Sequence, residues 1–212
     1  MGIAFPIVEN PIHWNEYPYI PALGENAKII FFHVPTAWLA SIAFLMSAYF
    51  GIKYLKNKTL VDDIKSYTAA QLGLVFCVLA TITGAVWANY TWGKPWSWDP
   101  RQTSIFALML IYGAYFALRS AIEDSEKKAV LSAVYSLIAF VTVPFFVFII
   151  PKMVNSLHPG SAGDPSPIGF KMNPNMKIEF FLSLTAFSIL FYWLWSIGYR
   201  SLILKEKNNN LL

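Results

Sequence analysis

The sequence has one cysteine and few charged residues. A single cysteine excludes an internal disulfide and a CxxC redox pair. Cys77 lies within an apolar run, and we expect it to be a small buried residue rather than a reactive thiol. Charged residues make up only 13% of the 212, whereas soluble domains carry about 25%. Because 56% of the residues are hydrophobic, this composition is typical of a polytopic membrane protein.

Five apolar runs are long enough to cross a bilayer, which requires about 20 helical residues. They cover approximately 31–52, 69–90, 103–120, 129–150 and 180–201. The runs are continuous and do not alternate apolar with polar residues, which favours helices over the strands of a membrane barrel. The sequence therefore predicts an all-α, polytopic transmembrane helix bundle with five spans.

The lysines and arginines predict the orientation of this bundle. Ten of them fall in the connecting segments 53–67, 119–128 and 200–212, and six fall in the segments 1–28, 91–102 and 151–178, which together are longer. Cations accumulate in cytoplasmic loops, so we expect the N-terminus outside and the C-terminus in the cytoplasm. The same distribution explains the net charge of +4 without a nucleic-acid partner.

The predicted domain organisation follows from this topology. We expect an outer N-terminal segment 1–28, a single transmembrane domain 29–205 and a cytoplasmic tail 206–212. The loop 91–102 and the loop 151–178 would both open on the outer face.

The first outer loop contains three tryptophans, in the stretch "WGKPWSWDPR" that begins at Trp92. Tryptophans at the ends of membrane helices are commonly interfacial anchors, which suits Trp92. That explanation suits Trp96 and Trp98 less well, because they lie in a loop with Gly93 and prolines on both sides.

The three histidines all fall on the predicted outer side. His33 precedes Pro35, and proline favours the first turn of a helix while disfavouring helical geometry in the residue before it. We therefore expect the helix to start near Val34 or Pro35, with His33 at the membrane surface. His158 lies in a turn-rich loop and could reach the same surface. His13, in a proline-rich tail, is expected to be solvated; an interfacial hydrogen-bonding role is the alternative for His33.

These outer residues together suit a flat, apolar, metal-containing macrocycle with acidic edges, namely haem b. Aromatic planes come from the tryptophans. Two neutral imidazoles come from His33 and His158 as axial metal ligands. Lys94 and Arg101 offer cations for the propionates. The alternative for Asp99 and Arg101 is that they pair with each other and shape the turn.

At these residues the chain resembles a known family. "WGKPWSWDPRQTS" resembles the WWD signature of membrane proteins that handle haem in cytochrome c biogenesis. "FHVP" before it and "NSLHPGS" after it resemble the C component of the cytochrome c maturation system, the haem exporter or haem-handling protein. The resemblance covers about residues 26 to 205.

The resemblance implies a function and a site. It implies that His33 and His158 are axial haem ligands on the periplasmic face of the bacterial inner membrane, and that the tryptophan loop is the haem platform. The loop residues implicated are Trp92, Gly93, Lys94, Trp96, Trp98, Asp99 and Arg101. It also implies delivery of haem to a periplasmic haem chaperone, alongside the subunits of an ABC transporter. The protein would then not be an enzyme, although a role in attaching haem covalently to the chaperone stays open.

The chain departs from the family in one respect, and three alternatives compete with this interpretation. The family usually has six spans, and with five spans predicted here we expect the first of the six to be the one not represented. The "WSWDP" stretch also resembles the synthetase subunits that attach haem to cytochromes, but those carry further histidines inside their spans. A transporter through the bundle would require polar residues in the spans, where 31–52, 69–90 and 129–150 offer essentially none that is ionisable. A scaffold for the maturation machinery would use the tryptophans as a docking patch.

Overall fold

The computed structural model describes residues 5–19, 24–158, 172 and 174–208, and it confirms the all-α membrane fold. Five helical segments in the described residues are long and apolar enough to cross a membrane. They are η2 (Gly24–Ile29) with α1 (Ile30–Asn57), α2 (Leu60–Trp92), α3 (Pro100–Ala121), α4 (Ser125–Pro144) with η3 (Phe145–Ile149) and α5 (Ile150–Met153), and α6 (Pro174–Asn208). Each helical segment is longer than the apolar run predicted for it. Five such segments make this a multi-pass membrane protein.

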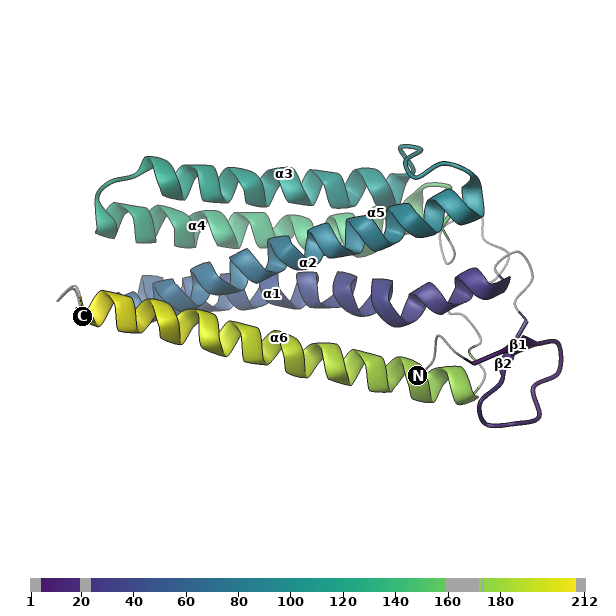
Figure 1. Ribbon diagram of the computed structural model, residues 1–212. Helices are drawn as coiled ribbons and strands as arrows, with labels where there is room; N and C mark the ends of the chain where they lie inside the picture. The colour runs from purple at the N-terminus through teal and green to yellow at the C-terminus, as the bar shows by residue number, and fades with distance from the viewer. Residues whose placement is uncertain (1–4, 20–23, 159–171, 173, 209–212) are drawn as a thin grey trace.

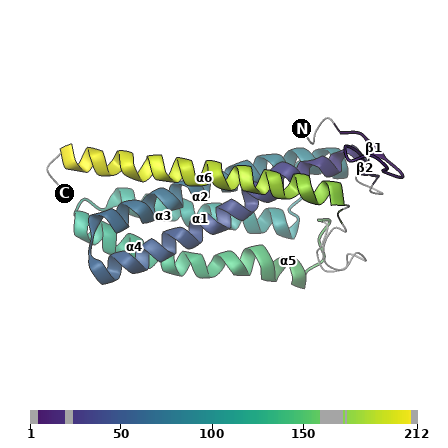
Figure 2. The ribbon, with the colours of Figure 1, turned by 90° about the horizontal axis from the view of Figure 1, so that it is seen from below.

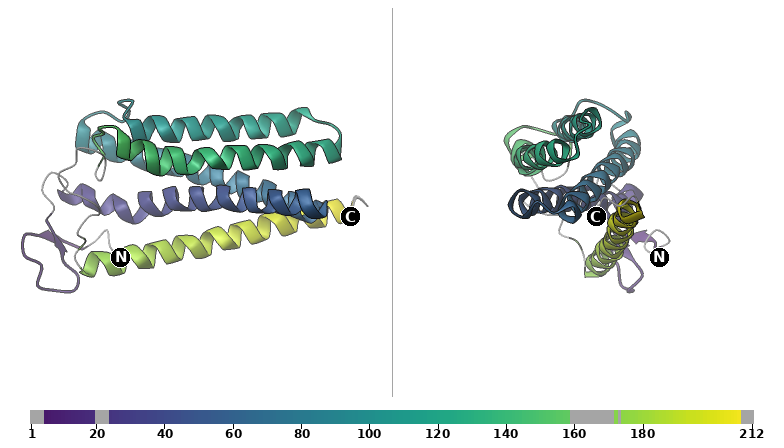
Figure 3. Two further views of the ribbon diagram at one scale, coloured as in Figure 1. Left: turned by 180° about the vertical axis from the view of Figure 1, so that it is seen from behind. Right: turned by 90° about the vertical axis from the view of Figure 1, so that its left-hand side faces the viewer.

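The helices run side by side in one elongated bundle (Figures 1 and 2). α1 packs against α2, α4 and α6, and the α3–α4 hairpin lies on the side of α1 and α2 away from α6 (Figure 3). The turns α1–α2 and α3–α4 lie at one end. The α2–α3 loop, α5 and the N-terminal strands lie at the other, which we call the tryptophan end.

Local sequence fixes the two ends of the tryptophan loop. Gly93 ends α2 in the left-handed conformation (φ 74°), which glycine adopts without steric cost, and its N–H bonds to the carbonyl of Asn89. Asp99 caps α3 by accepting from the N–H of Arg101, and Pro100 occupies the first helical position. The loop 93–99 is therefore short and held at both ends.

The predicted start of the first span was wrong. α1 begins at Ile30, so His33 and Pro35 both lie inside it. A proline at this position removes the N–H that would bond to the carbonyl of Phe31. The Ser183 hydroxyl of α6 donates to that carbonyl instead. Tertiary packing thus satisfies the acceptor that Pro35 leaves open, and the helix continues through it.

The fourth span changes helical geometry at Pro144. α4 ends at Pro144 and is followed by the π-helical turns of η3. Wider π turns frequently occur at functional sites in helices. Here they lead into α5, at the tryptophan end.

Close packing fills the middle of the bundle. Phe44 of α1 and Tyr112 of α3 are fully buried and stack with ring centroids 3.5 Å apart. A Cβ on Gly73 would lie 2.4 Å from the Phe44 ring, so the absence of a side chain at Gly73 lets α2 approach α1. Cys77 is buried in the same core, as predicted.

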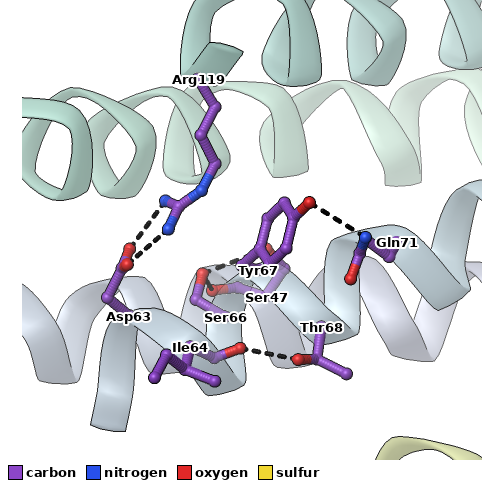
Figure 4. Close-up of polar contacts among 8 residues, drawn as sticks. All are labelled: Ser47, Asp63, Ile64, Ser66, Tyr67, Thr68, Gln71 and Arg119. Carbon is purple, nitrogen blue, oxygen red and sulfur yellow. Dashed lines mark hydrogen bonds and ion pairs between the residues drawn. The ribbon is translucent and has the colours of Figure 1, made fainter. Parts of the chain in front are cut away.

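The opposite end of the bundle contains a buried ion pair that sequence reasoning did not find. Arg119 of α3 donates two hydrogen bonds to the Asp63 carboxylate of α2, at 2.8 and 2.5 Å (Figure 4). The guanidinium also lies 4.6 Å from the centre of the Tyr67 ring. Residues 53–67 were expected to be a connecting segment. All but Lys58 and Thr59 are instead helical, which places Asp63 inside the bundle.

The N-terminal segment forms a small lobe beside α6 at the tryptophan end. β1 (Ile7–Val8) pairs in parallel with β2 (Tyr17–Pro18). The Asn175 side chain of α6 donates to the carbonyls of His13 and Glu16, which ties the lobe to the bundle. The His13 side chain is exposed, as predicted.

Candidate functional site

A cavity lies at the tryptophan end between α1, α2, α3 and the η3–α5 segment. Six of the nine predicted site residues line it: His33, Trp92, Trp96, Asp99, Arg101 and His158. The other three, Gly93, Lys94 and Trp98, are exposed and are not among the lining residues. The structure thus brings both histidines to one cavity and divides the tryptophan loop into a lining part and an outer part.

The two histidine rings lie close together in this cavity. Their ring centroids lie 6.3 Å apart, with an angle of 41° between the ring planes. A metal ion bound at about 2 Å by one nitrogen of each ring, from opposite sides, would separate the centroids by roughly 6 Å. The observed separation therefore suits two axial ligands of one metal centre.

Two neighbours on α2 fix the His33 ring. Its Nδ1 lies 3.1 Å from the Thr83 hydroxyl oxygen. That hydroxyl donates its own proton to the carbonyl of Leu79 (2.8 Å), so its oxygen accepts from His33 Nδ1–H. This tautomer leaves Nε2 as the nitrogen with a free lone pair. Gly84 gives the ring its space, because a Cβ there would lie 2.9 Å from His33 Cε1.

Trp87 is a cavity residue that sequence reasoning missed. Its ring lies edge-to-face with Trp92 at 5.0 Å and 5.8 Å from the His158 ring. The side chain is only 9% exposed, and within the described part of the chain its indole N–H has no hydrogen-bond partner. Buried indole N–H groups usually find an acceptor, so the cavity offers an unused donor beside His158.

The first turn of α3 holds the tryptophan loop in shape. Gln102 accepts from the N–H of Ser97 and donates to the carbonyl of Pro95, and Thr103 donates to the carbonyl of Trp98. Trp98 has a positive φ of 57°, a conformation that costs a non-glycine residue free energy. Its side chain is 65% exposed and packs against Trp96 and Phe106.

A periodic stripe of small residues on α2 creates space for the cavity, and this pattern is visible in the sequence. Along α2, the lining residues that precede Trp92 recur at a spacing of three or four positions. They are Cys77, Ala80, Thr81, Gly84, Ala85 and Trp87. Small side chains on the inward face of a helix leave volume between helices, and Trp87 closes the stripe at its outer end. Helical periodicity, applied to small residues, would have found it.

The donors at this site suit a macrocycle better than a bare metal ion. Across residues 5–19, 24–158, 172 and 174–208, no group of three or more His, Cys, Asp or Glu side chains could hold a metal ion. A bare zinc ion takes four ligands in most protein sites, three of them from the protein even in catalytic ones. Haem brings four nitrogens of its own and requires only axial ligands. Two imidazoles between aromatic walls meet that requirement.

These features define a multi-pass membrane protein with an aromatic, two-histidine cavity at one end of its helix bundle. The chain belongs to the Heme exporter protein C family, whose profile matches residues 16–212. The resemblance noted in the sequence is thereby confirmed.

Curated relatives agree with this assignment. Heme exporter protein C of Paracoccus denitrificans (strain Pd 1222) is 33% identical over 189 residues, which cover 89% of this chain and 78% of that protein. Heme exporter protein C of Escherichia coli (strain K12) is 29% identical over 184 residues, covering 85% and 72%. A putative cytochrome c biosynthesis ccmC-like mitochondrial protein of Marchantia polymorpha is 30% identical over 167 residues, covering 79% and 69%.

Proposed function

We propose that this protein handles haem for cytochrome c maturation by binding haem b in the tryptophan-end cavity and passing it to a periplasmic haem chaperone. His33 and His158 are the axial ligands in this proposal. The observation that carries it is the 6.3 Å separation of the two imidazole rings, within a cavity whose lining is mostly apolar and includes three tryptophans and Arg101.

Each lining residue has a role suited to its chemistry. Thr83 holds His33 in the tautomer whose Nε2 can bind iron. Trp92 and Trp96 supply planes against which the macrocycle packs. Arg101 lines the same cavity and matches a propionate with its planar guanidinium.

Delivery to a partner requires part of the bound haem to stay accessible. The cavity lies at the tryptophan end, and the exposed Trp98 and Lys94 belong to the same loop as its lining residues Trp92 and Trp96. With the orientation predicted from the lysines and arginines, this end faces the periplasm of a bacterial inner membrane. A chaperone would dock on these outer loop residues, and ABC transporter subunits would contact other parts of the bundle.

A transport path for haem through the bundle is disfavoured by packing. Phe44, which lines the cavity, stacks against Tyr112, and both rings are fully buried. Haem would have to displace this stack to pass toward the opposite end. Entry from the tryptophan end or laterally from lipid requires no such displacement.

The test is the visible spectrum of the detergent-purified protein after haem loading. We expect His33→Ala and His158→Ala each to lose the six-coordinate low-spin spectrum and most of the bound haem. His13→Ala is the matched control, because His13 is an exposed histidine at the same end. Unchanged spectra and unchanged haem occupancy in both ligand variants would refute axial ligation.

A further inference from the structure

The acidic residue of the tryptophan loop contacts the segment that carries His158. Asp99 is 6% exposed, and its carboxylate accepts hydrogen bonds from three donors. One comes from its own helix, the N–H of Arg101 at 3.0 Å. The others come from across the cavity rim: the Ser156 hydroxyl lies 2.8 Å from both carboxylate oxygens, and the Leu157 N–H lies 2.8 Å from Oδ2.

These contacts continue into the backbone of the histidine itself. The N–H of His158 donates to the Ser156 hydroxyl oxygen at 3.0 Å. Ser156 therefore accepts from His158 while it donates to Asp99, and the next residue donates to Asp99 directly. A buried carboxylate is stable only when its oxygens are hydrogen-bonded, and bonds to a charged group are among the stronger ones.

We propose that Asp99 is a positioning residue that holds His158 in place for haem, an inference that rests on the proposed function. Asp99 stands on the rigid N-terminus of α3, whose unpaired N–H groups and dipole favour a carboxylate. His158 lies beyond the end of α5 and has no helix of its own to fix it. The hydrogen bonds of Asp99 hold the segment around His158 against the N-terminus of α3. The position of the second axial ligand therefore depends on the tryptophan loop.

The first experiment measures, in the absence of haem, the mobility of the segment that carries His158. A nitroxide label on Leu157→Cys is suitable, because the Leu157 side chain is 62% exposed and the natural Cys77 is buried. We expect Asp99→Ala and Ser156→Ala to increase the mobility of the label. The matched control is Asn155→Ala, an exposed neighbour of Ser156, which should leave the mobility unchanged. Unchanged mobility in Asp99→Ala would overturn the proposal.

The second experiment measures the consequence for ligation. Second-sphere partners of metal ligands contribute about 10- to 100-fold to metal affinity, so we expect Asp99→Ala to weaken haem binding by a factor in this range. The spectrum should shift toward that of His158→Ala, and added imidazole should restore the six-coordinate form. The double variant Asp99→Ala, His158→Ala should bind haem no more weakly than His158→Ala alone, because Asp99 acts through His158.

The outcomes separate the two proposals. Additive losses in the double variant, or a six-coordinate spectrum in Asp99→Ala that matches the unsubstituted protein, would overturn the positioning role. If instead His158→Ala itself leaves the spectrum unchanged, the proposed function fails, and the label still reports whether Asp99 anchors the segment.

Discussion

Replacing Gly84 by alanine should move a haem ligand without unfolding the protein. A Cβ at Gly84 would lie 2.9 Å from Cε1 of His33, whereas ordinary contacts are 3.4–4 Å. The ring must therefore shift by roughly 0.5 Å or more, while iron–nitrogen bonds tolerate about 0.2 Å. His33 Cε1 belongs to the far end of a side chain, so the ring can move while the helices stay in place.

In Gly84→Ala, haem affinity should fall while the stability of the haem-free protein is maintained or rises. A ligand displaced by such a distance should weaken haem binding by about 10- to 100-fold. Alanine is favoured over glycine inside a helix by about 1 kcal/mol, so the thermal stability of the haem-free protein should not fall. The assays are haem titration followed by visible absorption and thermal unfolding followed by circular dichroism.

Gly113→Ala is the matched control, because Gly113 lies inside α3 and a Cβ there would meet nothing within 4 Å. It should leave haem binding unchanged. Haem affinity in Gly84→Ala equal to that of the control would refute the placement of His33 against α2. A loss of folding in Gly84→Ala would show that the helices, rather than the ring, absorb the clash.

Three further outcomes are expected. Arg119→Met leaves Asp63 buried without its bidentate partner and should cost about 3–5 kcal/mol of stability in thermal unfolding, partly recovered by adding Asp63→Asn, with the haem spectrum of the folded protein unchanged. Trp96→Ala should weaken haem binding itself, because Trp96 lines the cavity, whereas Trp98→Ala should retain haem and slow its transfer to the chaperone, measured as chaperone loading. Burial raises the pKa of Tyr17 to about 12, so the stability that this residue gives the N-terminal lobe is complete below pH 10 and is lost as pH rises through about 12; alkaline absorbance titration against Tyr17→Phe should detect it.

The sequence by itself determined the class of fold. Membrane spans are readable from sequence because a bilayer requires about 20 apolar residues in a helix, whatever the neighbouring helices do. It also indicated which residues share one end, since alternate loops of a helical bundle fall on the same side. For that reason His33, His158 and Trp96, widely separated in the chain, could be predicted to meet.

Only the tertiary structure decided how those residues are held. α1 passes through Pro35 because Ser183 of a distant helix bonds to the carbonyl that Pro35 leaves free, and no local rule for proline contains that contact. Asp99 was expected to pair with Arg101 or to bind the ligand. Its hydrogen bonds to Ser156 depend on where α5 ends, which is set by packing. Directional contacts between remote segments follow from helix positions, and helix positions depend on every side chain between them.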